Sequence, residues 1–538
     1  MKRNLIWILL LAAWMVQGCR KLNEETYSVL SSYSNETEVN AAVTGVYQTF
    51  FLNYPQTQGL VSMLESGNRY STFGSFGDTY WNTPYYDYVV TPQEATLADN
   101  WKMFYKMINN ANEVIEAVPG VVADQAKAEG YIAEARFLRG WAYFMLTQLW
   151  GEVPLHLQAT KSLSDRSAIY KPRAPIADIY KAVEEDLLYA VGKLPPTRAT
   201  AQLGRATRAA AMGLLGKVYL TMAGKPLSQA AAYQKAADIL NTLVQQAQNG
   251  TVNAGLLTTY GDIFSTRNEM NKEVLFAFRG SANSSSQSNG TIFPWIMGSH
   301  GCYPTGSGQF QPQMYGLRWD ILRLFENTGA DTRLRDGIGG RYPSLSDPQV
   351  NGVADTVYYD TTLFVYRLKS NPAFMVGFPG IVKIGLGYTK WKSQDGYIGS
   401  PSGFQKDWIV LRYADVLLCL AEALNELDQP GTALNLVNQV RQRAGASACP
   451  NVQYPGTDKI AVRALIRDER TRELIGEGTT IPDIRRWGTL EEEMNAMRAD
   501  QFFVGRVKPA YNARFQLYPV PFAEIATNSQ LLPQNPGW

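Results

Sequence analysis

The sequence predicts a mainly α-helical protein, in which an irregular segment of loops and short strands interrupts a scaffold of helical hairpins. Apolar residues recur every three or four positions over long segments, and short turns with Pro or Gly separate these segments. This pattern is typical of hairpin arrays of the tetratricopeptide type, in which each helix pair buries its apolar face on the next. Between about 251 and 404 the chain turns to Gly, Ser, Pro and short β-branched or aromatic runs, which predict loops and strands.

The helical periodicity defines nine segments. They span residues 36–52, 97–118, 123–150, 176–191, 207–221, 229–245, 411–427, 432–443 and 459–476. Pro119-Gly120 is expected to end the second of them, and Gly151 the third. Residues 53–92 are rich in Gly, Ser, Asn, Pro and aromatics and predict a loop, whereas residues 271–280 predict a short strand.

Residues 1–18 have the features of a secretory signal, with Lys2 and Arg3 before an apolar run at 5–15 and Gly18 before Cys19. The apolar run is too short to span a bilayer, which takes about 20 residues. A cysteine at this place resembles a bacterial lipobox, so we predict that Cys19 carries the lipid. An ordinary cleaved signal is the alternative, and Gln17 departs from the small residue usual there.

These features give a predicted organisation of the whole chain. Residues 19–35 are expected to form a lipidated tether and residues 36–538 a single domain. Within this domain, the helical scaffold is expected at about 36–250 and 405–538, and the loop-rich insertion at about 251–404. The chain after residue 18 has no apolar segment of membrane-spanning length, so lipid is the only expected contact with the membrane.

Charge and residue counts exclude several functions. Without Lys2 and Arg3 the chain has 48 basic and 48 acidic residues, so it lacks the positive field that nucleic-acid binding needs. Two histidines and three scattered cysteines, Cys302, Cys419 and Cys449, argue against histidine catalysis and a metal site. No cofactor is predicted, although a structural Ca²⁺ held by loop carbonyls would leave no mark in a sequence. Whether two of these cysteines form a disulfide stays open.

Charged residues within the predicted helices are interpreted as structural. Glu134, Arg136 and Arg139 lie on one helix and predict surface or inter-helix ion pairs, as do Arg412 and Asp415. Residues 467–473 place opposite charges three and four positions apart, which modestly stabilises a helix.

Ligand binding is predicted in two aromatic loops, because their aromatic residues do not follow helical spacing. Aromatic residues make up 12% of the chain, and aromatic faces stack on the C–H faces of sugar rings. Nearby polar side chains can hydrogen-bond sugar hydroxyls. The first loop, 68–88, contributes Asn68, Arg69, Asp78, Trp81, Asn82, Tyr85 and Tyr86, and the second, 291–319, contributes Trp295, Tyr303 and Phe310.

Several segments in order along the chain resemble the SusD/RagB family of lipoproteins. The most specific is AEARFLRGWAYFMLTQLWGEVPL at 133–155, and WIVLRYADVLLCLAEALNEL at 408–427 and YPVPFAEIATNSQLLPQNPGW at 518–538 also match. Residues 101–115, 204–220, 433–445 and 466–476 follow the family order. Residues 477–488 depart from it at Thr479–Pro482, which leaves the local helix geometry open.

This resemblance implies a non-catalytic protein of the outer membrane that faces the cell exterior. Its expected partners are an oligosaccharide or polysaccharide and a SusC-like TonB-dependent transporter that receives the ligand. Some family members take peptides, so peptide uptake is the alternative, and a purely structural lipoprotein is another. A glycoside hydrolase would need two carboxylates about 5 to 10 Å apart. Asp78, Asp87, Asp320 and Glu326 lie in or near the loops, but nothing in the sequence pairs them. The glycan and the membrane leaflet stay open.

Overall fold

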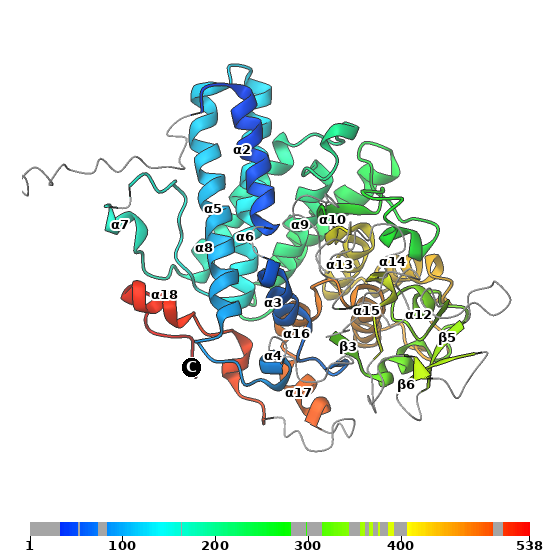
Figure 1. The fold of residues 1–538 in the computed structure, drawn as a ribbon. Coiled ribbons are helices and arrows are strands. Elements are labelled where there is room, and N and C mark those ends of the chain that lie inside the picture. Colours follow the sequence, from blue (N-terminus) through cyan, green and yellow to red (C-terminus); the bar gives the residue numbers. More distant parts are fainter. Residues whose placement is uncertain are drawn as a thin grey trace, which may run out of the picture.

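Helices dominate the computed structural model (Figure 1). It describes residues 33–51, 54–73, 83–162, 164–280, 297, 315–343, 356–360, 365–369, 375–376, 386–391, 406–498 and 509–538. The long helices are α2 (Glu36–Gln48), α3 (Tyr54–Glu65), α5 (Ala95–Val121), α6 (Gln125–Trp150), α8 (Ile176–Lys193), α9 (Arg208–Ala223), α10 (Ala232–Gln248), α13 (Tyr413–Glu426), α14 (Pro430–Arg443) and α15 (Lys459–Leu474). The shorter ones are α4 (Thr83–Asp87), α7 (Arg166–Ile169), α12 (Arg333–Asp336), α16 (Thr480–Trp487), α17 (Leu490–Arg498) and α18 (Phe522–Thr527). The predicted mainly α-helical fold class is confirmed.

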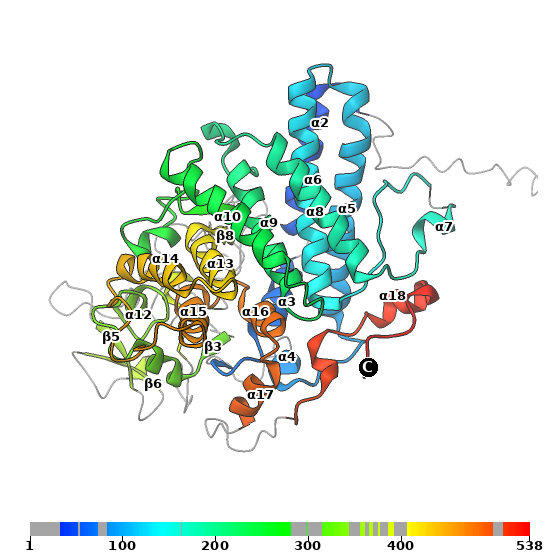
Figure 2. The ribbon, with the colours of Figure 1, turned by 180° about the vertical axis from the view of Figure 1, so that it is seen from behind.

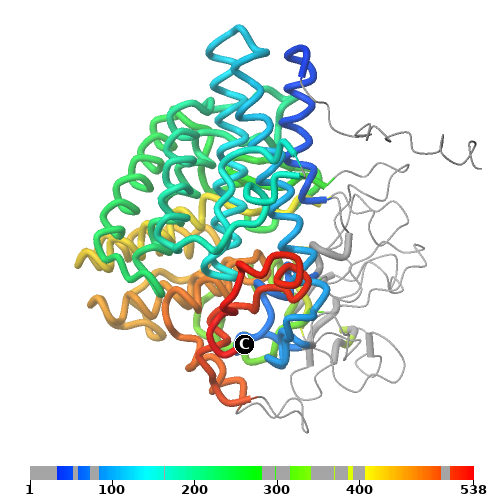
Figure 3. The backbone as a smooth tube through the Cα atoms, turned by 90° about the vertical axis from the view of Figure 1, so that its left-hand side faces the viewer, coloured from blue at the N-terminus to red at the C-terminus, as the bar shows by residue number. Residues whose placement is uncertain are grey.

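The long helices stack in chain order and form one array of hairpins. α5 packs on α6, α6 on α8, α8 on α9, and α9 on α10. The array continues with α13, which packs on α10 although residues 249–412 separate the two helices in sequence. Figure 2 shows α10 beside α13, and in Figure 3 the yellow and orange helices continue the stack of cyan and green ones. Within the described residues, no helix is long and apolar enough to cross a membrane.

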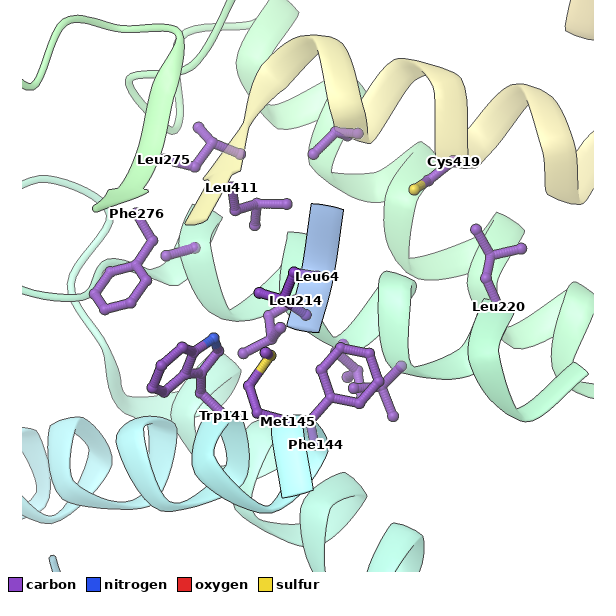
Figure 4. Close-up of a cluster of buried hydrophobic side chains, with 14 of the residues drawn as sticks. Leu64, Trp141, Phe144, Met145, Leu214, Leu220, Leu275, Phe276, Leu411 and Cys419 are labelled. Atoms are coloured by element: carbon purple, nitrogen blue, oxygen red, sulfur yellow. The ribbon is translucent and has the colours of Figure 1, made fainter. Parts of the chain in front are cut away.

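Small residues bring α9 into close contact with its neighbours. A Cβ atom on Gly216 would lie 2.3 Å from Leu240 Cδ2 of α10, so only glycine allows this approach. In Figure 4, Trp141 and Phe144 of α6 lie below Leu214 of α9 in a cluster of buried side chains. Each large apolar side chain in such a core stabilises the fold by about 1.5–3 kcal/mol.

The residues predicted to end the helices do so, with one exception. The Asp124 carboxylate accepts hydrogen bonds from the first backbone N–H groups of α6, and Gly151 ends this helix in a positive-φ conformation, φ 74°. Pro119-Gly120, in contrast, does not end α5, which runs on to Val121. Pro119 lies in the last turn, where a proline removes one backbone hydrogen bond from a helix that ends two residues later.

Two predicted boundaries are wrong. Residues 53–92 contain the helix α3, which packs on α5 and α16 through a core that includes Leu60 and Leu64. The residues that suggested a loop are the proline in its first turn and Gly59, where a Cβ would lie 2.8 Å from Thr96 Cβ of α5. Residues 408–412 form a strand, and the helix predicted from residue 411 begins at Tyr413.

The strands form three small antiparallel sheets. β2 (Val274–Phe278), which confirms the predicted strand, pairs with β8 (Trp408–Arg412) on the helical array. β1 (Ser71–Phe73) pairs with β3 (Tyr315–Leu317). The remaining strands are β4 (Arg341–Pro343), β5 (Thr356–Asp360), β6 (Val365–Leu368) and β7 (Met375–Val376), which lie side by side in this order.

Buried ion pairs join α15 to the elements around it. Glu473 of α15 is fully buried, and its carboxylate lies 2.5 Å from Arg412 Nη1 of β8 and 2.9 Å from Arg333 Nη1 of α12. It also pairs with Arg443 of α14. Burial alone would raise the pKa of Glu473, but the three guanidinium groups hold it well below its usual range. One residue of α15 therefore links three elements that are far apart in sequence.

The same arrangement recurs in other helices and corrects the sequence interpretation. Arg470 of α15 lies 2.7 Å from both Asp415 of α13 and Asp483 of α16. Arg139 of α6 pairs with Asp186 of α8 at 2.7 Å, and Glu134, also buried, pairs with Arg198 at 3.0 Å. The prediction of inter-helix pairs is right for these residues. The prediction of surface pairs is wrong for these residues, because their charges are buried and must be compensated across helices. The predicted pairing within residues 467–473 is present, since Arg472 lies 2.9 Å from Glu469 one turn earlier in α15.

A carboxylate from α3 closes the turn that follows α15. The Glu65 side chain is 4% exposed and accepts hydrogen bonds from Gly476 N and Thr479 N, both at 3.1 Å, and from Thr480 Oγ1 at 2.7 Å. Burial raises the pKa of Glu65 to about 7, and these hydrogen bonds oppose the rise. The turn leads into α16, so Glu65 fixes α16 relative to α3. The four residues that left the helix geometry open in the sequence, Thr479–Pro482, thus form the anchored end of this turn and the first turn of α16.

We expect Arg412→Met to destabilise the protein far more than Arg463→Met. The first substitution removes a buried cation that pairs with both Glu473 and Glu477, and breaking such buried pairs costs about 3–5 kcal/mol. Arg463 makes a bidentate pair with Glu426, but its side chain is 35% exposed, so its loss should cost under about 1 kcal/mol. Urea unfolding of both variants measures the difference, and equal losses would contradict this role of the buried network.

Glu65→Gln should reduce the pH dependence of stability between pH 4.5 and 7. Because the folded pKa is raised, the contribution of Glu65 to the unfolding free energy is complete below about pH 4.5 and is lost as the pH rises through about 7. Over this window the free-energy difference between wild type and variant should change by roughly 3 kcal/mol. Urea unfolding at pH 5 and pH 8 tests this, with the exposed Glu491→Gln as control. Parallel pH curves for wild type and Glu65→Gln would show that Glu65 does not titrate there.

Candidate functional site

A two-stranded sheet joins the two predicted ligand loops at their roots. β1 and β3 are antiparallel, and Phe73, the last residue of β1, is the partner of Tyr315, the first residue of β3. The chain leaves Phe73 into residues 74–82 of the first loop and reaches Tyr315 from residues 298–314 of the second. Opposed residues in such a pair lie about 4.5–5.5 Å apart. The two loops therefore share one root, although 241 residues separate Phe73 and Tyr315 in the chain.

Further contacts fix this root to the body of the protein. Leu317 and Leu386 exchange two backbone hydrogen bonds of 2.7 Å, and Arg318 N donates to Tyr70 O at 2.7 Å. The Tyr315 hydroxyl is hydrogen-bonded to Ser62 of α3. The loop root is thus part of a rigid frame made by α3, β1, β3 and residues 386–391.

The second loop has another anchor near its start. Met297 is 1% exposed, and its carbonyl accepts a hydrogen bond of 3.0 Å from Tyr388 N. Tyr388 packs so closely over Gly476 that a Cβ there would lie 2.6 Å from its ring, and Gly476 has φ +83°. Trp295, a predicted ligand residue, precedes this anchor by two positions.

Two predicted ligand residues are buried instead. Tyr85 and Tyr86 of α4 are 2% and 3% exposed. The Tyr85 ring packs edge-on against Tyr518 at 5.6 Å, and its hydroxyl is hydrogen-bonded to Thr96 of α5. Tyr86 clusters with Met497 of α17. The prediction that these two rings stack on a ligand is wrong, because their faces are covered by the protein, where they hold the end of the first loop in place.

The side chains of Asn68 and Arg69 also form hydrogen bonds or ion pairs with other residues of the protein. Asn68 is 1% exposed, its Nδ2 donates to Glu65 O at 2.7 Å, and its Oδ1 accepts from Tyr70 N at 2.8 Å. The prediction that it binds a sugar hydroxyl is therefore wrong. Arg69 Nε donates to Glu493 of α17 at 2.8 Å, and its guanidinium also pairs with Glu492. These bonds shape the turn between α3 and β1, which starts the first loop.

The remaining predicted site residues stay predictions. Asp78, Trp81, Asn82, Trp295, Tyr303, Phe310 and the lipid-attachment residue Cys19 lie outside the described residues. What the structure adds is the position of the ends of the segments that carry the six loop residues.

Sequence reasoning missed the residues that support the loop ends. Tyr88 follows α4 in a left-handed conformation, φ 57°, and its hydroxyl donates to Gly67 O. Its ring packs against Phe515 at 4.9 Å. Gly67 itself has φ +88°, and a Cβ there would lie 2.9 Å from the Tyr88 hydroxyl. The tyrosine-rich run at 85–88 was a usable signal, because large aromatic side chains gain most when they are buried.

The titratable residues and cysteines of the described chain bear on the predictions for metal binding and catalysis. They contain no cluster of three His, Cys, Asp or Glu residues that could hold a metal ion. Asp320 is paired with Arg318 at 2.7 Å, and burial lowers the pKa of His156 to about 4. Cys419 and Cys449 are buried free thiols, and Cys302 lies outside the described residues.

Two family models and several relatives match the chain. The model described as "SusD family" matches residues 382–538, and the one described as "Starch-binding associating with outer membrane" matches residues 22–220. A SusD-like protein of Formosa agariphila is 26% identical over 537 residues, which cover 96% of this chain and 95% of the relative.

Solved structures share the fold. A SusD homolog from Bacteroides thetaiotaomicron has a TM-score of 0.77 at 24% identity, with 94% of this chain and 98% of that chain covered. A laminarin-binding SusD-like protein has a TM-score of 0.71 at 23% identity, with 94% and 100% covered. The family models match both ends of the helical array, and the relatives match nearly its whole length. The chain belongs to the SusD/RagB family.

Proposed function

We propose that this protein captures an oligosaccharide with its two aromatic loops and delivers it to a partner TonB-dependent transporter of the outer membrane. The pairing of Phe73 with Tyr315 carries this proposal, because it gives both loops one root. A solved protein of the same fold is a laminarin-binding SusD-like protein, which supports a glycan as ligand.

A rigid root suits this role for an energetic reason. A site made from two free loops would lose conformational entropy when it closes on a ligand, whereas loops fixed at their ends lose less. Here the root is fixed by the strand pair, by Leu386 and by the Ser62–Tyr315 contact. In this proposal Trp81 and Trp295 supply stacking faces, while Asp78 and Asn82 supply hydrogen-bonding groups for sugar hydroxyls.

Membrane attachment and the transporter belong to the same proposal. A matched family model is described as associating with the outer membrane, which supports a membrane-bound role. Acylation of Cys19 would tether the body through residues 19–35 and keep the loops close to a membrane partner. A SusC-like transporter is the partner that the family assignment suggests. No catalytic step belongs to this role.

Trp81→Ala and Trp295→Ala should each weaken glycan binding by about tenfold or more, since an aromatic anchor contributes roughly 2 kcal/mol or more. The mature chain is titrated by calorimetry with laminarin, xylan, starch, mannan and pectin. Phe522→Ala is the matched control, because Phe522 is an exposed aromatic side chain, 56% accessible, on α18.

The possible results distinguish glycan capture from peptide uptake and from the absence of any capture role. Binding of one glycan class, weakened by both tryptophan variants and unchanged in Phe522→Ala, would support the proposal. If no glycan binds and a peptide library does, the ligand class is wrong and peptide uptake takes its place. If neither binds, the capture role itself fails.

A further inference from the structure

Two polar cavities of the described chain share one wall. The first, about 200 Å³, lies among α15, α16, α17 and the turn Asn68–Tyr70. The second, about 250 Å³, lies among α15, α16, the end of α13 and the turn after α9. Arg467 of α15 and Trp487 of α16 line both cavities, and Arg467 Cζ lies 5.2 Å from the centre of the Trp487 ring. This stacked pair therefore separates two neighbouring cavities.

Arg467 differs from the other basic residues of its helix, because it has no carboxylate partner in the part of the chain that the structure describes. Every other Lys or Arg of α15 is in an ion pair: Lys459 with Asp428, Arg463 with Glu426, Arg470 with Asp415 and Arg472 with Glu469. Among the described residues Arg467 has none, and its buried Nε has no hydrogen-bond partner. A guanidinium carries five N–H donors. The wall between the cavities thus holds a buried hydrogen-bond donor, Arg467 Nε, that has no partner among the described residues.

The charges around the cavities favour a neutral ligand. Their lining residues include six Lys or Arg side chains and six Asp or Glu side chains. A bound anion would face the carboxylates and a bound cation the guanidinium groups, so neither charge is favoured overall. A hydroxyl group can accept a hydrogen bond from Arg467 and donate one to a carboxylate such as Asp468. A ligand with several hydroxyl groups satisfies both kinds of side chain.

Aromatic walls and size point to sugar rings. Tyr70 lines the first cavity, Tyr233 the second, and Trp487 both. A cavity of about 150 Å³ is enough for a benzene molecule. Each of the two cavities therefore has room for one six-membered ring with its substituents.

We propose that the two cavities form a second carbohydrate site, which holds two linked sugar residues on either side of the Arg467–Trp487 pair. This inference takes its ligand class from the proposed function, but it does not use the loop residues Trp81 and Trp295; it shares with the first predicted loop only the turn Asn68–Tyr70. A second site on the same body would let one long glycan contact the protein at two places, which raises the overall affinity.

The test uses disaccharides, which fit this site and are short. Saturation-transfer NMR measures binding of laminaribiose, cellobiose, maltose and xylobiose to the mature chain, with sodium sulfate and Ala-Ala as competitors. Arg467→Met removes the donors and keeps the aliphatic stem. Ala464→Phe narrows the first cavity at an exposed position and removes no polar group. Lys459→Met, on the same helix but outside both cavities, is the charge control, and Trp81→Ala reports on the loop site.

At least one disaccharide should bind and should lose about tenfold or more in affinity in Arg467→Met and in Ala464→Phe, with Lys459→Met and Trp81→Ala unchanged. Wild-type affinity in both cavity variants, or no disaccharide binding at all, would overturn the second site. In either case laminarin binding that depends on Trp81 would leave the proposed function standing. Competition by sulfate or Ala-Ala that disappears in Arg467→Met would instead assign the cavities to an anion or a peptide.

Discussion

Compensation of buried charge around α15 is the constraint on which the rest of the structure depends. Glu473 alone pairs with residues of β8, α12 and α14. Glu469, one turn earlier, pairs with Arg333 at 2.7 Å and Arg441 at 2.8 Å. A carboxylate buried without its cation costs several kcal/mol of folding free energy. We therefore expect β8, α12 and α14 to separate from α15 together when the protein unfolds. The network therefore fixes where the chain re-enters the helical array after the interior segment.

The segment that follows α15 is also connected to the root of the ligand loops by direct contacts. Glu477, just after α15, pairs with Lys390 at 2.7 Å, and Trp391 Nε1 donates to Gly476 O at 3.1 Å. These contacts hold residues 386–391, where Leu386 bonds to Leu317 of β3. β3 in turn pairs with β1. From the opposite side, Glu65 binds the turn that follows α15 and sits at the end of α3, just before β1. The root of the two loops is thus connected to the ion network from two directions.

Periodicity in the sequence was sufficient for the elements whose order is set locally. The helices α5, α6, α8, α9 and α10 and the strand β2 were predicted within a few residues, because their apolar spacing and their terminal Gly, Pro and Asp residues lie within one segment. α3 was missed because its proline and its contact glycine resemble loop markers. The pairing of β1 with β3 and the ion pair of Arg333 with Glu469 join residues more than 130 positions apart, and no local pattern reports such contacts.

For the candidate ligand site, the sequence was a better guide to the segments that form it than to the individual side chains that contact a ligand. Tyr85, Tyr86 and Asn68 were chosen for their chemistry, but the structure buries them as supports of the loop. Residue type alone cannot separate an aromatic ring that stacks on a ligand from one that packs in the protein. The Arg467–Trp487 pair was not predicted as a site. Arg467 lies in a helix whose other basic residues form ion pairs, so the sequence suggested a structural role for it as well.

The most direct measurement of the central claim is a double-mutant cycle on glycan binding with Trp81→Ala, Trp295→Ala and both together. Calorimetry gives the binding free energy and the stoichiometry for laminarin, or for the polysaccharide of the panel that binds most tightly. If the two loops that share the β1–β3 root bind one ligand molecule together, the effects of the two substitutions on the binding free energy should differ from additivity by about 0.5 kcal/mol or more. Each single substitution should also weaken every binding event at the loop site. Strictly additive effects, with each variant losing only part of that binding, would mean that the two loops do not form one site.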